Sequence, residues 1–514
     1  MECGLQWKDI TCWDEVPRLT LTHEETLEAA IPDYCPDMGR VVEASGTLCL
    51  RSITARSGSL ELKGTVRVTV LYTSEESVGL RSLTQAVPFV CTAENRPARG
   101  LHHTPLTQAV PFVCTAENRP LAACQVLWAA GRLLLCEAQA LTPRRLSLRL
   151  MPEWTVCGYT CTTVQLCCGV EEDPALRLRR REHELYMTAA MAERECAVAG
   201  EVTVPAGQPA PEDLLLCRLY PQVASCQLVG AKLLVKGELT LCALYRCQQQ
   251  KLHTYTAAVP FSQIVDSPAG GEEGDVAARV QLICGEARLL RTEESSGFSV
   301  SAELRLLLRI TRKETVSCVT DLYSTHCGTK LETAERSLPL APERPVRQEA
   351  VQHLDFGRQR PFVFVTDTAC APSAGEDGTP CADVRMRLLY LDEEEAPAVT
   401  EKMAQLPLGE GEVCTLCGAP EVAFTGSGCD LRQAVAVSPA AAPRETLSTV
   451  SAVQCLPEQE NARRPSLVMR RLAPGETLWD AAKQYRTDEE LIRAVNQLEE
   501  GTVPDKMLLI PRVR

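Results

Sequence analysis

The feature that most constrains this chain is an alternating segment that ends in Leu–Tyr and occurs three times. The copies run over residues 64–72, 237–245 and 382–390, and a charged or polar turn follows each tyrosine. Alternation of apolar and polar residues with a period of two is typical of a strand with one buried face. We therefore expect three tandem all-β domains, each with its motif tyrosine half-buried against its own domain. A proline-led segment follows each copy, at Pro88–Phe89, Pro260–Phe261 and Pro407–Leu408.

The whole-chain composition narrows the class of protein. A chain of 514 residues is long enough for several domains, because single cores rarely grow beyond about 300 residues. The formal net charge of −14 argues against a nucleic-acid-binding protein, which needs a basic face. The polar start, residues 1–10, does not resemble a signal peptide, and no apolar run reaches the ~20 residues of a membrane span. We expect a protein that stays inside the cell and does not insert into a membrane.

The last fifty residues follow a different pattern. A short strand around Val468 leads into a Pro474–Gly475 turn, after which Thr477 is placed to cap a helix that reaches Tyr485. A second helix with apolar residues on one face follows, and residues 507–510 form a closing strand. The order strand–helix–helix–strand predicts a small α/β domain after the β domains.

Residues 466–513 resemble a LysM module. The resemblance depends on the turn Pro474-Gly-Glu-Thr-Leu-Trp479, on Asn496 and on the ending Leu508-Leu-Ile-Pro511, although Glu476 replaces the usual Asp. It implies a shallow ligand groove between two loops. Trp479 could stack on a sugar, but its place within the first helix favours a core position, and Asn496 is expected to end its helix through a hydrogen bond. The groove residues implied by the resemblance are Gly475, Glu476, Thr477 and Leu478 on one side, and Gln497, Leu498, Pro504 and Asp505 on the other.

The three β units resemble SPOCS domains, which occur in coat proteins of endospore-forming bacteria. Besides the Leu–Tyr strands, the resemblance depends on residues 30–37, 140–145, 259–262 and 319–324. It is strongest over residues 165–325 and weaker in the third unit, where Ala382 replaces Gly and Leu408 replaces Phe. SPOCS domains followed by a LysM module resemble the coat morphogenetic proteins of clostridia and their relatives.

These patterns give a provisional division of the chain. The expected parts are an N-terminal segment (1–22), a first SPOCS-like domain (23–160), a second (165–325), a divergent third (326–456), a linker (457–465) and LysM (466–513). We expect LysM to meet the β domains only through that linker. Residues 83–97 recur letter for letter as 106–120, so only one copy can occupy the strand position, and the insert near 98–120 is expected to be a surface loop.

Twenty-six cysteines leave three interpretations open. Most lie in strand-like runs, where a thiol behaves as a small hydrophobe in a reducing compartment. A zinc site would need Cys414 and Cys417, the single Cys-x-x-Cys pair, with Cys429 and Cys455 as further ligands. The third interpretation is later oxidation, with thiols that cross-link during assembly.

No catalytic constellation is found in the sequence. It has no glycine-rich phosphate loop, no Gly-x-Ser-x-Gly and no His-Glu-x-x-His, and its seven histidines are dispersed. We therefore expect a non-catalytic protein that holds no metal and no cofactor.

The resemblance implies a structural protein of the endospore coat. It would lie in the mother-cell cytoplasm at the forespore surface, joining coat layers to that surface with LysM as the docking unit. The implied partner is the coat-basement ATPase, stage IV sporulation protein A, or another coat protein. The alternative is a protein whose LysM holds peptidoglycan, an N-acetylglucosamine glycan, at the spore cortex or cell wall.

Overall fold

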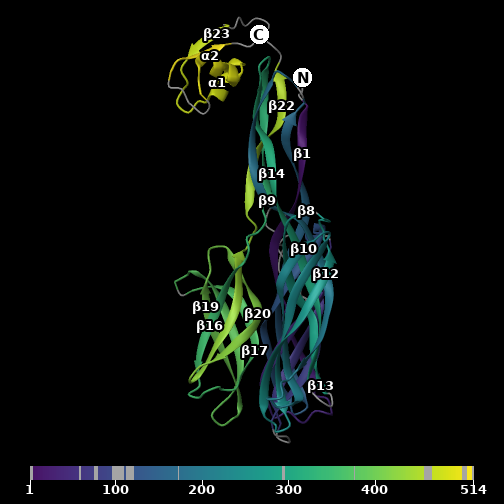
Figure 1. The fold of residues 1–514 in the computed structure, drawn as a ribbon. Coiled ribbons are helices and arrows are strands. Elements are labelled where there is room, and N and C mark those ends of the chain that lie inside the picture. Colours follow the sequence, from purple (N-terminus) through teal and green to yellow (C-terminus); the bar gives the residue numbers. More distant parts are fainter. Residues whose placement is uncertain are drawn as a thin grey trace.

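The computed structural model describes residues 4–56, 59–74, 79–94, 109–111, 121–171, 173–271, 273–291, 296–375, 377–456, 466–499 and 506–511. The fold is mainly β, as predicted, and both α-helices of these residues lie near the C-terminus. Figure 1 shows a broad body at one end, a narrow stalk that rises from it, and a small helical module at the tip of the stalk. Within the described ranges, no helix is long and apolar enough to cross a membrane.

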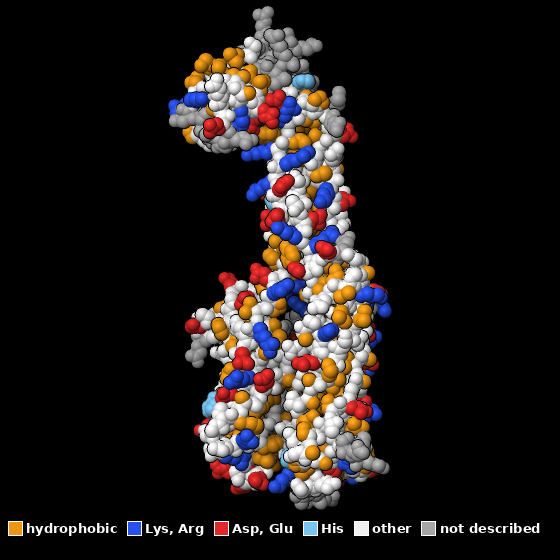
Figure 2. All heavy atoms as spheres, viewed as in Figure 1, with side chains coloured by type: hydrophobic (Ala, Val, Ile, Leu, Met, Phe, Trp, Pro, Cys, Tyr) orange, Lys and Arg blue, Asp and Glu red, His pale blue; other side chains and the backbone are white. Residues whose placement is uncertain are grey.

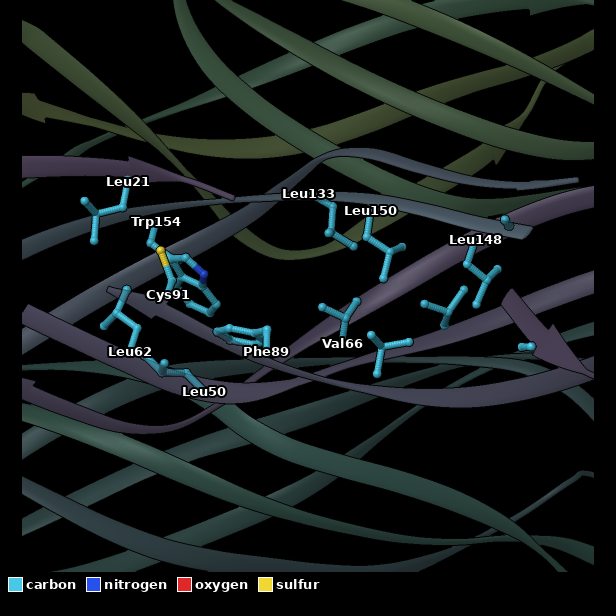
Figure 3. Close-up of a cluster of buried hydrophobic side chains, with 14 of the residues drawn as sticks. Leu21, Leu50, Leu62, Val66, Phe89, Cys91, Leu133, Leu148, Leu150 and Trp154 are labelled. Atoms are coloured by element: carbon cyan, nitrogen blue, oxygen red, sulfur yellow. The ribbon is translucent and has the colours of Figure 1, made fainter. Parts of the chain in front are cut away.

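Domain 1 is a sandwich of two sheets. One sheet has the order β3-β4-β5-β6, and in the other β8 pairs with β1, β2 and β7. Apolar side chains from both sheets point into one core, where Phe89 of the first stacks on Trp154 of the second with ring centroids 5.5 Å apart (Figure 3). The elements are β1 (Leu5–Thr22), β2 (Glu25–Ala30), β3 (Arg40–Arg56), β4 (Ser59–Thr73), β5 (Leu80–Glu94), β6 (Ala109–Pro111), a 3-10 turn (Leu121–Ala123), β7 (Val126–Thr142) and β8 (Arg145–Val170).

Domains 2 and 3 repeat this plan. In domain 2 the sheets are β10-β11-β12 and β13-β14-β9, and in domain 3 they are β17-β18-β19 and β16-β21-β20, with β15 paired to β22. Domain 2 contains β9 (Leu176–Thr203), β10 (Pro211–Val229), β11 (Lys232–Cys247), β12 (Leu252–Asp266), β13 (Asp275–Arg291) and β14 (Ser296–Ser324). Domain 3 contains β15 (Gly328–Pro339), β16 (Val346–Asp355), β17 (Val363–Ala374), β18 (Pro380–Leu391), β19 (Pro397–Pro407), β20 (Glu412–Phe424), β21 (Gly428–Pro439) and β22 (Arg444–Leu456).

The stalk is made of three two-stranded ribbons, one from each domain. In domains 1 and 2 the first and last strands pair as β1–β8 and β9–β14, and β8, β9 and β14 also belong to the sandwich. In domain 3 the ribbon is a separate pair of strands, β15–β22. Residues 1–22 were expected to lie outside domain 1, but β1 pairs with β8 and forms one ribbon, so that expectation was wrong. All three ribbons contribute apolar side chains to a shared core, which includes Ile10, Leu166, Leu185, Val316, Leu338 and Leu447.

The motif tyrosines pack within their own domains, and two of them are more buried than predicted. Tyr72 and Tyr245 are fully buried, and their hydroxyls donate to the carbonyl oxygens of Pro36 (3.2 Å) and Pro209 (3.0 Å). A buried phenol needs such a partner, and the equivalent bond satisfies it in both domains. Tyr390 is half-buried and packs against the Phe356 ring of domain 3.

The leucine before each tyrosine joins the three domains to one another. Leu71, Leu244 and Leu389 are fully buried and belong to one cluster that all three domains share. Successive side chains of a strand point to opposite faces. The tyrosine therefore enters its own sandwich, while the leucine faces the neighbouring domains.

A buried polar network completes this three-domain junction. The Arg218 guanidinium of domain 2 donates to the carbonyl oxygens of Gly46 in domain 1 and Thr366 in domain 3, both at 2.7 Å. Beside it, the Glu43 carboxylate of domain 1 lies 3.1 Å from the Arg387 guanidinium of domain 3 and accepts from the Thr366 hydroxyl at 3.3 Å. Burial raises the pKa of Glu43 to about 7. The junction is therefore specified by charge as well as by apolar contact.

The proline-led strands lie directly across from the motif strands. Phe89 is opposite Gly64 and Phe261 is opposite Gly237, so each ring covers a glycine across the ladder. In domain 3 the residue opposite Ala382 is Leu406, so the sequence match of Leu408 to the phenylalanines was wrong. Of the duplicated segment, the first copy supplies β5. The second is described only at Ala109–Pro111, a short strand parallel to β5.

Candidate docking module at the tip of the stalk

The C-terminal module has the predicted order of strand, helix, helix and strand. Its elements are β23 (Leu467–Arg470), α1 (Leu478–Tyr485), α2 (Glu489–Asn496) and β24 (Leu508–Pro511), with β23 antiparallel to β24. The expected linker, residues 457–465, lies outside the described residues. The core is formed by Leu478, Ala481, Ala482, Ile492, Leu508 and Ile510.

The turn before α1 is held by its own side chains. Gly475 has φ of +82°, a conformation that favours glycine, and the Thr477 hydroxyl accepts from the Asp480 amide at 3.3 Å in a capping box. Hydrogen bonds from Thr477 hold the pKa of Asp480 below its usual value. The Glu476 carboxylate accepts from the Ala473 amide (2.8 Å), so this side chain stabilises the turn. Leu478 is 4 % exposed and belongs to the core, so it is not available to line a groove.

The opposite side of the expected groove follows α2. The Asn496 amide donates to the Leu509 carbonyl (2.6 Å) and accepts from the Leu509 amide (2.7 Å), so it joins the end of α2 to β24, in agreement with a structural role. Gln497 is exposed, with φ of +52°, and the Leu498 side chain is half-buried on the module core. Pro504 and Asp505 lie outside the described residues. Among described residues, no hydrogen bond or ion pair connects the two sides, and both pack on the same core.

The module is mounted on the outer face of the β9–β14 ribbon. The Tyr323 ring of β14 meets the Trp479 ring of α1 edge to face, with centroids 4.8 Å apart, and the Tyr323 hydroxyl donates to the Thr487 carbonyl at 2.8 Å. The Trp479 indole donates to the Asp321 carboxylate at 2.7 Å, and Lys483 pairs with the same carboxylate. The expectation that module and β domains meet only through a linker was therefore wrong.

The sequence explains why the module packs on the β9–β14 ribbon and not on either of the other two. All three ribbons carry a one-residue bulge near the tip, at residues 168, 320 and 451. The residue after the bulge is Gly169, Asp321 or Ala452, and two positions further on it is Glu171, Tyr323 or Gln454. The ribbon of domain 2 alone has an acid and an aromatic ring at these two positions. Arg177 of β9 adds an ion pair with Asp488 at the start of α2.

Apolar side chains remain exposed on the mounted module. Figure 2 shows hydrophobic side chains gathered on its outer surface, away from the stalk. On β23, Leu467 and Met469 are 51 % and 63 % exposed, while Val468 between them packs on the core. On α2, Leu491 and Val495 are spaced by four residues and both are exposed. An exposed apolar surface of this kind commonly marks a site of protein contact.

The cysteines of the proposed zinc site do not come together. Cys414 packs against the core of domain 3, Cys417 lies on the other face of β20, and Cys429 is buried elsewhere in that core. Cys455 is in the stalk, where its thiol contacts that of Cys327. Across the described ranges, no group of three or more His, Cys, Asp or Glu side chains is arranged to hold a metal.

Comparison with known proteins bears on domain 2. Residues 211–283, which form β10, β11, β12 and part of β13, match the family model described as "SipL, SPOCS domain". This segment is therefore similar to a SPOCS domain. Domains 1 and 3 lie outside the matched residues and share the two-sheet plan of domain 2. No curated protein and no solved structure matches the chain.

Sequence reasoning missed the residues that mount the module on the β9–β14 ribbon. Residues 319–324 were singled out as a family feature, but Asp321 and Tyr323 lie on the outer face of a strand, where a solvent contact is the ordinary expectation. A signal was nevertheless present, because the aligned positions of the other two ribbons carry neither residue.

Proposed function

We propose that this chain is a non-catalytic assembly protein of the bacterial endospore coat, with the βααβ module as its docking unit. The SPOCS match supports a sporulation-associated protein. The elongated scaffold, with its module at the tip, supports a role in linking two layers (Figure 1). In this proposal it lies in the mother-cell cytoplasm at the forespore surface.

The observation that carries the proposal is the way the module is mounted. The Trp479 ring, the aromatic side chain that could stack on a sugar, lies against Tyr323 and Asp321 of the stalk. The Glu476 carboxylate is similarly engaged within its own turn. The exposed apolar side chains of α2 and β23 favour a protein partner. We propose the coat-basement ATPase, stage IV sporulation protein A, or another coat protein.

Glycan binding is the second candidate. It is supported by the LysM resemblance and by the exposed Gly475 turn, where backbone groups are open to a ligand. In this alternative the module holds peptidoglycan at the cortex or wall, and the apolar face of α2 plays no part.

Two binding assays on the full chain separate these candidates. The purified ATPase and purified peptidoglycan are offered to wild type, to Leu491→Glu and to Val495→Glu. A charge in a small desolvated interface costs ~2–4 kcal/mol, so ATPase binding should fall at least about thirtyfold while glycan binding is unchanged. Met403→Glu, at a residue of domain 3 that is 52 % exposed, is the matched control. Peptidoglycan binding without ATPase binding would favour the second candidate.

A further inference from the structure

Domain 3 contains a pair of thiols that faces domain 1. Cys370 lies in β17 and Cys414 in β20, strands that belong to the two facing sheets of the sandwich. The two thiols are in hydrogen-bond contact, and both side chains are half-buried on the domain 3 core. Cys414 is thus paired across the sandwich, and not with Cys417 of its own Cys-x-x-Cys segment.

A guanidinium from domain 1 lies beside this pair. Arg132 of β7 donates to the Cys370 carbonyl oxygen at 3.0 Å and is held by an ion pair with Glu153 at 2.6 Å. Hydrogen bonding from Cys370 and the charge of Arg132 lower the pKa of the Cys414 thiol, although burial opposes them. The same hydrogen bond, together with burial, raises the pKa of Cys370. A thiol that ionises readily, next to a second thiol, is the arrangement of a redox-active pair.

We propose that Cys370 and Cys414 form a redox-controlled disulfide that fastens the two sheets of domain 3 together. The oxidant is a small disulfide such as oxidised glutathione. The Cys414 thiol gives its proton to solvent, and the thiolate attacks one sulfur of the oxidant. A Cys414–glutathione bond forms and a glutathione thiolate leaves.

The second step closes the protein disulfide. The Cys370 sulfur attacks the Cys414 sulfur, its proton passes to the second departing glutathione thiolate, and the Cys414–glutathione bond breaks. Two protein thiols are oxidised, and one disulfide of the oxidant is reduced to two thiols. The bond closes a loop between distant strands, so it disfavours the unfolded chain and persists in a finished assembly. This inference is independent of what the module binds.

A second thiol pair provides an internal comparison. Cys327 and Cys455 also touch, where β15 begins and β22 ends, but burial raises the pKa of Cys327. If ready ionisation controls the first step, this pair should oxidise later than Cys370 and Cys414.

The test is an oxidation series on the reduced full-length protein. Samples are exposed to one fixed ratio of oxidised to reduced glutathione, alkylated at intervals, digested without reductant and mapped by mass spectrometry. We expect the first internal disulfide to join Cys370 to Cys414, at a rate about tenfold higher than that for Cys327 and Cys455. The melting temperature of domain 3 should rise by roughly 5 °C and return on reduction. A first disulfide elsewhere would overturn the proposal.

Single variants test the order of the two steps. Cys370→Ser should accumulate glutathione on Cys414, while Cys414→Ser should leave Cys370 largely unmodified. Cys417→Ser, on the same strand but the opposite face, is the control and should oxidise as wild type does. Equal glutathione incorporation in the Cys370→Ser and Cys414→Ser variants would contradict the assigned roles. Circular dichroism of each variant checks that the sandwich is intact.

Discussion

Tyr323 and Trp479 meet edge to face across the boundary between the stalk and the terminal module, and the tyrosine is 1 % exposed. Without the module, this ring would lie on the outer face of a solvent-exposed ribbon. The contact makes the module part of a continuous rod, so a partner bound at the tip would be held in a defined direction relative to the body.

Tyr323→Ala should release the module from the stalk while both parts remain folded. The change removes an aromatic pair and the hydrogen bond to Thr487, a loss of about 2–4 kcal/mol at the interface. Small-angle scattering should show a broader distribution of lengths, and proteases should cleave between the parts faster. Leu491→Ala, on the exposed side of α2, is the control. An unchanged scattering profile would mean that the remaining contacts are sufficient.

Deletion of residues 466–514 should lower the stability of the stalk, contrary to the view of the module as an independent appendage. The deletion exposes Tyr323 and leaves the Asp321 carboxylate without its partners from α1. A combined change, deletion with Tyr323→Ser, should restore the solubility that the exposed ring reduces. Light scattering and thermal unfolding of the two truncated proteins make the comparison.

Arg218→Met should destabilise the three-domain junction more than the same substitution at any single exposed arginine. The buried guanidinium satisfies carbonyl oxygens in both neighbouring domains, and its removal leaves them without donors, at a cost of ~3–5 kcal/mol. Urea denaturation measures the loss. Arg288→Met, whose side chain is 76 % exposed, is the control. A loss equal to that of the control would show that the junction is held by its leucines alone.

Local residue patterns were sufficient to predict many of the strands and both helices. They did not predict which element each face would pack against. The alternation around Tyr72 and Tyr245 predicted strands with a half-buried ring packed on its own domain, because that information lies within nine residues; the rings are fully buried. The packing of Leu71 at the three-domain junction could not be predicted, since its partners come from two other domains. β1 was missed for the same reason: its partner, β8, lies more than a hundred residues away. In the module, helical periodicity identified both helices, yet the groove assignment placed the core residue Leu478 on the surface.

The Glu43 carboxyl should make domain 1 less stable as the pH rises. Burial raises its pKa from 4.5 to about 7, so the folded state favours the protonated form. This preference stabilises the folded state by up to ~3 kcal/mol. The stabilisation is fully present below pH 4.5 and is lost as the pH rises through 7. Glu43→Gln should flatten the dependence and be the more stable protein at pH 8. Denaturation at pH 5 and pH 8 measures this, with exposed Glu28→Gln as control. Equal slopes for Glu43→Gln and wild type would remove Glu43 as the cause.

Gly64→Ala should show why the first two domains carry glycine where the third carries Ala382. An added Cβ would lie 2.1 Å from the Cys49 carbonyl oxygen and 2.8 Å from the Phe89 ring, so we expect a loss of about 1–3 kcal/mol. Gly207→Ala, with no atom within 4 Å of the new Cβ, is the control.

In domain 3 the smaller Leu406 faces Ala382. Adding Phe89→Leu to Gly64→Ala should therefore cost less than the sum of the two single changes, by ~0.5–1.5 kcal/mol in a double-mutant cycle. Only part is recovered, because the Cys49 carbonyl still crowds the methyl group. Strict additivity would show that the ring and the glycine are independent, and that the backbone contact alone requires glycine at this position.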